Sequence, residues 1–183
     1  MTADLRARIG VDVGNKLALE DAVEWAGDHD VALIEVQLDH GSDAFTNLER
    51  RRTALIRARC ERMGLRLALH TSSAVNVAEV APLVGDAVDA YLCGYVDAAT
   101  ELGAAWIVMH AGYHFTSDTR NRMQVGLERL QRVTAYAEGH GVKLLLENLN
   151  KEPPHAEVRY LAHTLDEWRW YYDQITSPAF ALD

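Results

Sequence analysis

Four side chains that could bind a metal ion each follow a short apolar run in this sequence. The run LRLAL is followed by His70, WIVM by His110, KLLL by Glu147 and FAL by Asp183. Imidazole nitrogens combined with carboxylate oxygens suit Zn, Mn, Fe or Co better than Ca. One such residue is often structural, but these four recur at intervals of 40, 37 and 36 residues. The regular spacing predicts that they share one site.

The apolar runs predict strands, and the stretches between them have helical patterns. The six runs rich in Val, Ile and Leu that we expect to be strands are Arg8–Val13, Val31–Val36, Leu65–His70, Ala105–His110, Val142–Glu147 and Ala179–Asp183. The helical stretches are Leu19–Gly27, Asn47–Met63, Val77–Leu102, Arg120–Glu138 and Leu165–Ile175. Strict alternation of strand and helix predicts a parallel sheet with helical crossovers. In such folds the active site lies at the carboxyl ends of the strands.

Local signals predict how these helices begin, end and pack. We expect Val77–Leu102 to be two helices broken near Gly85, and the fourth helix to end at Gly139, because glycine is common just after a helix. Thr164 and Glu167 form a capping-box pattern at the start of the last helix. The repeating apolar positions that we expect to pack that helix on the core are Leu165, Trp168, Tyr172 and Ile175.

Two architectures fit the alternation: an open doubly wound sheet and a closed (β/α)8 barrel. A nucleotide-binding doubly wound sheet usually has a glycine-rich phosphate loop in its first strand–helix turn. Here Val11–Lys16 reads VDVGNK, which has neither the G-x-G-x-x-G nor the P-loop pattern. The strand ends lie 34 residues apart on average, so eight units would need about 270 residues, close to the roughly 250 of a typical barrel. We therefore expect an α/β fold, the first five and a half units of a (β/α)8 TIM barrel.

We expect residues 1–183 to form a single domain, a barrel truncated at its C-terminus. A sheet of six parallel strands would leave its first and last strands unpaired on one side. A longer natural polypeptide would supply the missing strands, or a partner, such as a second copy in a homo-oligomer, would close the sheet.

Composition excludes several classes of protein. Of the 183 residues 49% are hydrophobic and 25% are charged, as in globular domains, and the formal net charge is −9. No stretch approaches the roughly 18 apolar residues of a membrane span, and the start of the chain lacks the apolar core of a signal peptide. Two cysteines cannot build a disulfide framework, so we expect a cytoplasmic protein with no membrane partner. The acidic balance disfavours nucleic acid; the seven arginines between Arg50 and Arg66 are expected on the outside of the barrel.

Short motifs at the predicted strand ends resemble the xylose isomerase-like TIM-barrel superfamily. The motifs are His110-Ala111-Gly112, Leu145-Leu146-Glu147-Asn148, His70-Thr71-Ser72, Glu35 in the second strand and the terminal Ala181-Leu182-Asp183. Together they cover essentially the whole chain. The superfamily includes sugar and sugar-phosphate isomerases and epimerases and the endonuclease IV group of apurinic-site nucleases.

The resemblance implies roles for the strand-end residues. Glu147 and Asp183 look like the first two metal ligands, which a His and a Glu from later strands complete in the family; this sequence ends before those strands. His70 and His110 resemble positions that bind substrate in the isomerases and extra zinc ions in the nucleases. All four are thus candidate ligands of a divalent metal, Mn, Zn, Mg or Co. Glu147, His110 and His70 are the candidate catalytic residues.

Three further residues are candidate substrate contacts. Asn148 begins a long polar loop that runs to Arg159, and its side chain could hydrogen-bond a sugar hydroxyl. His114 lies four residues after His110, in another loop. Glu35 is a polar residue inside an apolar run, and it could instead orient a metal ligand or belong to a structural ion pair.

The leading hypothesis is a metal-dependent isomerase or epimerase of a sugar, sugar phosphate or related polyol ketone, with proton transfer next to a metal-bound carbonyl. One alternative is an endonuclease IV-like zinc phosphodiesterase acting on abasic DNA, which would use the same residues with more metal. Another is a non-catalytic partial barrel that acts by association, because the later ligands are missing.

Overall fold

The computed structural model describes residues 9–115 and 118–183. Six parallel strands within them form one sheet in the order β1-β2-β3-β4-β6-β8. They are β1 (Val11–Gly14), β2 (Leu33–Val36), β3 (Arg66–His70), β4 (Ile107–Met109), β6 (Leu144–Leu146) and β8 (Phe180–Leu182). All six predicted strands form and each is shorter than predicted, although β1 ends one residue later, at Gly14; the expected fold class is confirmed. Arg8, the start of the first predicted strand, lies outside the described residues.

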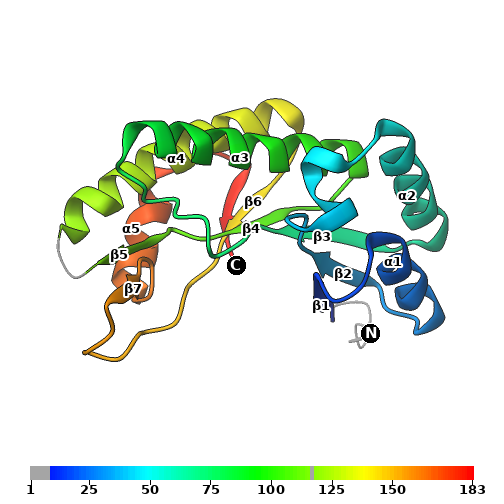
Figure 1. The fold of residues 1–183 in the computed structure, drawn as a ribbon, viewed down its shortest axis with the longest axis horizontal. Coiled ribbons are helices and arrows are strands. Elements are labelled where there is room, and N and C mark those ends of the chain that lie inside the picture. Colours follow the sequence, from blue (N-terminus) through cyan, green and yellow to red (C-terminus); the bar gives the residue numbers. More distant parts are fainter. Residues whose placement is uncertain (1–8, 116–117) are drawn as a thin grey trace.

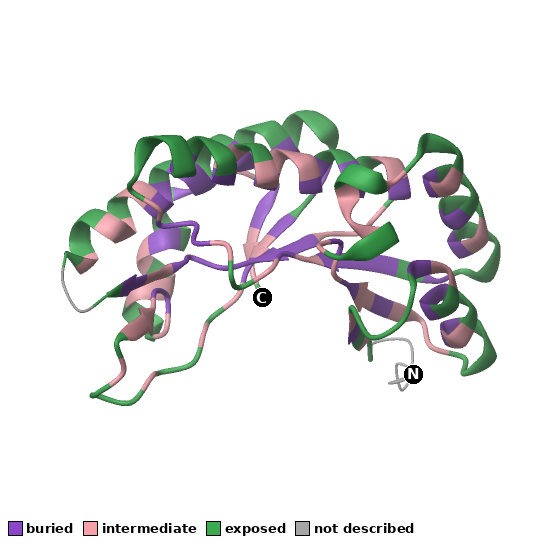
Figure 2. Cartoon of the chain, viewed as in Figure 1, coloured by how far each residue is buried: buried purple, intermediate pink, exposed green. Residues whose placement is uncertain are grey.

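Helices cover the outer side of the sheet, and the strands line the inner side of the resulting arc (Figure 1). The helices are α1 (Leu19–Asp28), α2 (Arg50–Met63), α3 (Pro82–Leu102), α4 (Thr119–His140) and α5 (Leu165–Gln174), with short 3₁₀ turns η2 (Gly41–Asp43) and η3 (Phe45–Asn47) after β2. Figure 2 shows buried residues on the strands and on the strand-facing sides of the helices. In the described part of the chain, no helix combines the length and apolarity needed to cross a membrane.

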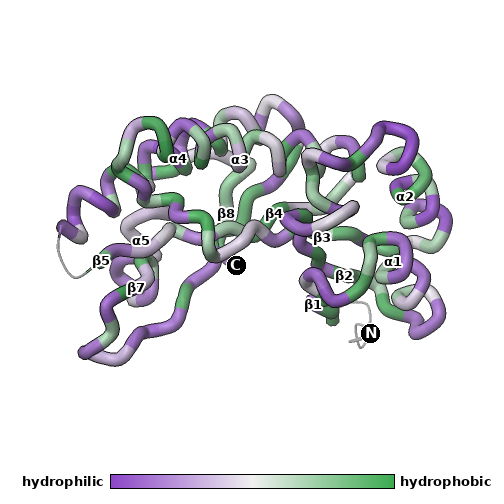
Figure 3. The backbone as a smooth tube through the Cα atoms, in the orientation of Figure 1, coloured by the Kyte–Doolittle hydropathy of each residue, from purple (hydrophilic) through white to green (hydrophobic). Residues whose placement is uncertain are grey.

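A short antiparallel ribbon was not expected from the sequence. Its strands, β5 (Tyr113–Phe115) and β7 (Val158–Tyr160), belong to the chain segments that follow β4 and β6. Strands of three residues are too short for an alternating pattern to be recognised. The ribbon lies beside α5, and Figure 3 shows that the chain between β6 and β7 is mostly hydrophilic. This ribbon adds a wall beyond the carboxyl ends of the main strands.

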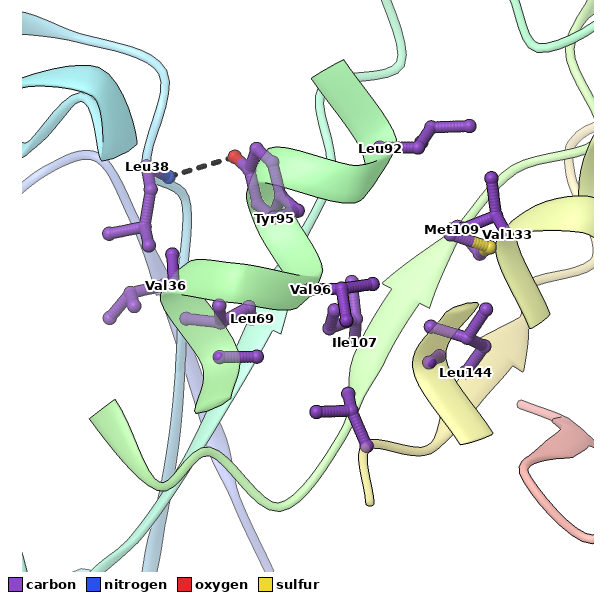
Figure 4. Close-up of a cluster of buried hydrophobic side chains, with 14 of the residues drawn as sticks. Val36, Leu38, Leu69, Leu92, Tyr95, Val96, Ile107, Met109, Val133 and Leu144 are labelled. Carbon is purple, nitrogen blue, oxygen red and sulfur yellow. Dashed lines mark hydrogen bonds between the residues drawn. The ribbon is translucent and has the colours of Figure 1, made fainter. Parts of the chain in front are cut away.

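One face of the sheet packs against α3 and α4. Figure 4 shows this layer, which includes Val36, Leu69, Ile107, Met109 and Leu144 from the strands and Leu92, Tyr95, Val96 and Val133 from the helices. Successive side chains of a strand point to opposite faces. Glu35 and His70, each next to one of these core residues, therefore point to the face that the helices do not cover.

Two helix predictions are wrong in detail. α3 is one helix that begins at Pro82, rather than two helices broken near Gly85. Proline favours the first helical position because its ring fixes φ, and Gly85 packs in the first turn, where an added Cβ would lie 2.8 Å from the Arg129 guanidinium. α4 continues through Gly139 and ends at His140; the next residue, Gly141, has a φ of +70°, the left-handed conformation common after a helix terminus.

The residues that α5 buries are not all those predicted from the sequence. Tyr171 is fully buried, whereas Tyr172 is 47% and Leu165 is 64% exposed. Trp168, Tyr171 and Ile175 succeed one another at three and four residues, which is the helical period. Tyr171 therefore takes the core position that the sequence pattern assigned to its neighbour.

Tyr95 fastens α3 to the segment that follows β2. Its buried hydroxyl accepts a hydrogen bond from the Leu38 backbone N–H at 2.9 Å, drawn in Figure 4, and donates one to Asp39 at 2.6 Å. Tyr91 donates to the other oxygen of Asp39 at 2.7 Å and accepts from the Ser72 backbone N–H at 2.9 Å. One helix thus holds the segments after β2 and β3.

Tyr95→Phe should destabilise the fold, because it leaves the buried Leu38 N–H without an acceptor. We expect the free energy of unfolding to fall by about 1–3 kcal/mol, measured by urea denaturation followed by circular dichroism. Tyr136→Phe is the matched control, since it removes a hydroxyl bonded to an exposed carboxylate, that of Asp97, and should cost less than about 0.5 kcal/mol. Equal losses in the two variants would contradict the anchoring role of Tyr95.

Candidate functional site

The carboxyl ends of four neighbouring strands place the predicted residues at one edge of the sheet. His70 is the last residue of β3, and His110, Glu147 and Asp183 directly follow β4, β6 and β8. These strands are adjacent and parallel. The His70 ring lies on the inner face, because the preceding Leu69 packs on the outer one.

Three of these side chains, His70, His110 and Glu147, converge and are called the strand-end cluster below. The Nε2 atoms of His70 and His110 are 3.0 Å apart. Glu147 Oε2 lies 2.9 Å from His110 Nε2 and 3.5 Å from His70 Nε2. His110 is 4% exposed, while the other two are partly open to solvent. Two imidazole nitrogens and one carboxylate oxygen therefore converge at the carboxyl end of the sheet.

Glu35 on β2 fixes the orientation of the His70 ring. Its Oε1 lies 2.7 Å from His70 Nδ1. A carboxylate oxygen can only accept, so Nδ1 carries the proton, and in the neutral ring Nε2 then directs a lone pair at the cluster. This geometry fits both alternatives to a substrate contact: a carboxylate that orients a metal-binding imidazole and a member of an ion pair.

Ionic interactions hold Glu147 deprotonated and His70 protonated when no cation is bound. Hydrogen bonds from His110 and then from His70 lower the pKa of Glu147 to about 2, against the effect of burial. Burial lowers the pKa of His70, but its hydrogen bonds to Glu147 and Glu35 outweigh burial and raise that pKa to about 10. The cluster then contains an imidazolium between two carboxylates.

Asp183 lies beside Glu147 on the next strand but outside the convergence. Its backbone N–H donates to the Leu146 carbonyl at 3.0 Å. Partial burial, followed by the negative charges of Glu35 and Glu147, raises the pKa of its side chain. Among the described residues, the donor atoms that converge belong to the strand-end cluster, and Asp183 is close enough to feel the charges of Glu35, Glu147 and His70.

The donor atoms of the cluster fit a divalent transition metal. Ligands held tetrahedrally at about 2.0–2.1 Å lie roughly 3.3 Å apart, and the three separations here are 2.9, 3.0 and 3.5 Å. Two imidazole nitrogens this close repel through their lone pairs unless a proton or a metal ion lies between them. His110 Nδ1 is buried without a partner among the described residues, so the ring bonds through Nε2 alone.

Asn76 is a positioning residue that the sequence analysis did not identify. It is 7% exposed, and its Oδ1 accepts from the N–H groups of Ala78 at 3.1 Å and Tyr113 at 2.9 Å. Gly112 makes this approach feasible: its φ is +93°, and an added Cβ would lie 2.5 Å from Ala78 N. Gly112 in the motif after His110 was the available signal, because glycine often marks a close backbone approach.

The remaining candidate contacts lie outside the strand-end cluster. Asn148 is exposed directly after Glu147, at the start of the segment that leads to β7. His114 is 6% exposed on β5 and lines a separate cavity together with Arg159. The structure thus divides the predicted residues between two places, the strand ends and the ribbon.

Comparison with known families agrees with this architecture. The family model described as xylose isomerase-like TIM barrel matches residues 23–182. A search of curated proteins returns no significant match.

Solved structures with the same fold include several sugar epimerases. A D-tagatose 3-epimerase-like protein is 17% identical, with a TM-score of 0.77 over 95% of this chain and 64% of that one. The D-psicose 3-epimerase from Clostridium cellulolyticum H10, solved with D-tagatose, is 16% identical, with a TM-score of 0.79 over 94% of this chain and 61% of that one. An L-ribulose 3-epimerase is 18% identical, with a TM-score of 0.75 over 95% of this chain and 59% of that one. The chain spans 59–64% of the length of these structures, and at such identities the likeness shows the fold alone.

The His70 ring should remain protonated at pH 8 in the presence of a chelator, because its pKa of about 10 lies above that pH. Glu35→Gln removes one of the two carboxylates and should lower this pKa toward 6.5, measured from the imidazole proton shifts in an NMR titration. Since the folded-state value is raised, the associated stabilisation is complete below about pH 6.5 and is lost as the pH rises through 10. Glu61→Gln, on the outer side of α2, should leave the titration unchanged. A wild-type His70 that titrates near 6.5 would contradict the arrangement.

Proposed function

Starting from a chain that belongs to the xylose isomerase-like TIM barrel family, we propose that this protein is a metal-dependent isomerase or epimerase of a sugar or related polyol ketone. The observation that carries the proposal is the convergence of His70 Nε2, His110 Nε2 and Glu147 Oε2 at the ends of adjacent strands. Structures of the same fold include 3-epimerases named for D-psicose and L-ribulose, which supports a small sugar as the substrate.

The strand-end cluster would hold the divalent ion, with Asp183 as the neighbouring candidate ligand. Such an ion supplies a Lewis acid for the negative charge that develops on a substrate carbonyl oxygen. Glu35 keeps the His70 ring oriented through Nδ1, and loss of partners of this kind typically weakens metal binding. Because two of the three converging donors are imidazoles, the set suits Zn, Mn or Co better than Mg.

Glu147 is the residue that we assign to proton transfer. Isomerisation and epimerisation both remove a proton from the carbon beside a carbonyl and later return one. Oε2 faces the two imidazoles, which leaves Oε1 as the oxygen to receive the proton. The lowered pKa keeps the Glu147 carboxylate ionised at neutral pH, which is the form that accepts a proton. Epimerisation also needs a second group that returns a proton to the opposite face of the carbon, whereas isomerisation can return it from the same face.

A zinc phosphodiesterase acting on abasic DNA is the second candidate, and one observation favours it. His70 and His110 direct Nε2 toward Glu147, as metal ligands do, whereas the isomerase resemblance implies that they bind substrate. The charge distribution opposes this candidate: the net charge is −9, and arginines of α2 lie on the outer side in ion pairs such as that of Arg52 with Glu20. DNA binding needs positive charge where the phosphates lie.

The purified protein should bind one of Zn²⁺, Mn²⁺ or Co²⁺ through the strand-end cluster. Glu35→Gln should weaken this binding about 10–100-fold, and His70→Ala should weaken it further, because a ligand is lost. Metal content after dialysis and competition with a chelating dye measure the affinity, with Glu61→Gln as the matched carboxylate control. A protein that binds none of these ions would favour the non-catalytic partial barrel instead.

With metal bound, the protein should exchange the hydrogen next to the carbonyl of a ketohexose with solvent. D-fructose and D-tagatose in D₂O are suitable substrates, and deuterium incorporation is followed by NMR. Glu147→Gln should slow the exchange at least about 100-fold, and a chelator should abolish it. Absence of exchange, combined with chelator-sensitive cleavage of an abasic duplex, would transfer the assignment to the phosphodiesterase.

A further inference from the structure

A cavity of about 320 Å³ lies beside the β5–β7 ribbon, and within the described residues no member of the strand-end cluster lines it. Its volume falls in the range of small-molecule sites, about 300–1,000 Å³. Its walls come from the ribbon, from the start of α4, from the segment after β6 and from the start of α5. The lining side chains that carry the argument are His114, Lys151, Glu152, Arg159, Tyr160 and Glu167.

Two of these lining residues have a buried polar atom without a hydrogen-bond partner among the described residues. The atoms are Arg159 Nε, a donor, and Glu167 Oε2, an acceptor. His163 Nδ1 lies 3.2 Å from Glu167 Oε2 and 2.9 Å from the Tyr160 carbonyl, so one Nδ1 proton faces two acceptors and Glu167 Oε2 keeps capacity for a further donor. Unpaired buried polar atoms are costly, and a ligand that can donate and accept would satisfy both.

The local structure holds these groups in place. Thr164 Oγ1 accepts from the Glu167 backbone N–H at 3.2 Å, which fixes the first turn of α5. Arg159 Nη2 donates to the Pro154 carbonyl. His114 and Arg159 are directly opposite one another in the ribbon, so their side chains lie on the same face. Burial, and next the charge of Arg159, lowers the pKa of His114, which leaves a neutral ring that can donate from one nitrogen and accept at the other.

The charges around the cavity select among ligand classes. Lys151 and Arg159 are balanced by Glu152 and Glu167. A phosphate or carboxylate would therefore face as many negative as positive side chains. Each hydroxyl of a polyol both donates and accepts, so adjacent hydroxyls can accept from the arginine and donate to the carboxylate. The mixed set suits a sugar better than an anion.

We propose that this cavity binds the hydroxyl groups of a second sugar ring, linked to the ring that reacts at the strand-end cluster. The proposal rests on the proposed function and narrows its substrate class to glycosylated ketoses. His114 follows His110 by four residues, so their Cα atoms lie at most about 14 Å apart. Because no residue of the strand-end cluster lines the cavity among the described residues, a single ring bound at the cluster leaves the cavity unfilled, and a second linked ring is needed to occupy it.

Isothermal titration with isomaltulose, a fructose that carries a glucosyl group on its sixth carbon, tests the proposal against D-fructose alone. The metal-loaded wild-type protein should bind isomaltulose at least about tenfold more tightly than D-fructose, because charged hydrogen bonds are added. Arg159→Met and Glu167→Gln should each remove this preference and leave the affinity for D-fructose unchanged. Arg57→Met and Glu61→Gln, which alter an exposed ion pair of α2, are the matched controls and should keep the preference.

Equal affinity of the wild-type protein for the two sugars would overturn the proposal, as would a preference that persists in Glu167→Gln. Glu167→Gln is nearly isosteric, so it decides the matter if Arg159→Met does not fold. Displacement of isomaltulose by millimolar inorganic phosphate would assign the cavity to an anion and overturn the proposal too. Exchange activity on D-fructose without the preference refutes the second-ring site alone. The preference without exchange on any ketose refutes the proposed function alone.

Discussion

The alternation of side chains along parallel strands decides where the functional groups of this protein lie. Val36, Leu69 and Ile107 pack under α3, so the residues next to them must point to the other face. Parallel pairing then brings the ends of β3, β4, β6 and β8 to one edge. The helices bury one face and thereby leave the opposite one free for imidazoles and carboxylates. The site is in this sense a consequence of how the core is packed.

Bringing several carboxylates to one edge of the sheet creates electrostatic repulsion, which the neighbouring side chains offset only in part. Glu35, Glu147 and Asp183 place three carboxylates near the His70 ring. The pKa of Asp183 is raised first by burial and then by the negative charges of Glu35 and Glu147, so part of their mutual repulsion persists. A proton on His70 offsets part of it, as the pKa of about 10 indicates. A divalent cation at the same point would offset more, and it would also separate the two Nε2 atoms that lie 3.0 Å apart. The electrostatics therefore support the proposal of a metal site independently of the family likeness.

The sequence predicted the strands and their polar ends because both depend on local patterns. In a run such as VKLLLE, the apolar residues predict a buried strand and the final polar residue marks where the strand ends. The near-constant spacing of these polar residues indicated that they lie at the same edge of the sheet. Helix details were less accessible: Gly85 lies in the first turn of α3, where the Arg129 guanidinium occupies the space that a side chain would need, a contact made across 44 residues of sequence. Tyr171 is buried instead of Tyr172, because the rotation of α5 is set by what it packs on. Similarly, Trp168 donates from Nε1 to the Leu146 carbonyl, and no sequence pattern predicts that hydrogen bond.

The ribbon shows why part of a site cannot be derived from spacing. His114 and Arg159 are 45 positions apart, and only the pairing of β5 with β7 makes them neighbours. Glu167 belongs to a capping-box pattern, which predicts that its side chain bonds the helix terminus, yet within the described residues its Oε2 accepts no hydrogen bond and lies 3.2 Å from His163 Nδ1. A local rule that is obeyed by the backbone and broken by the side chain marks a group kept for another partner. The strand ends supply the residues of the proposed metal centre, and the ribbon supplies hydrogen-bonding groups of both kinds. Chemistry and selectivity would thus lie on separate elements, the first on the rigid sheet and the second on the loops that follow it.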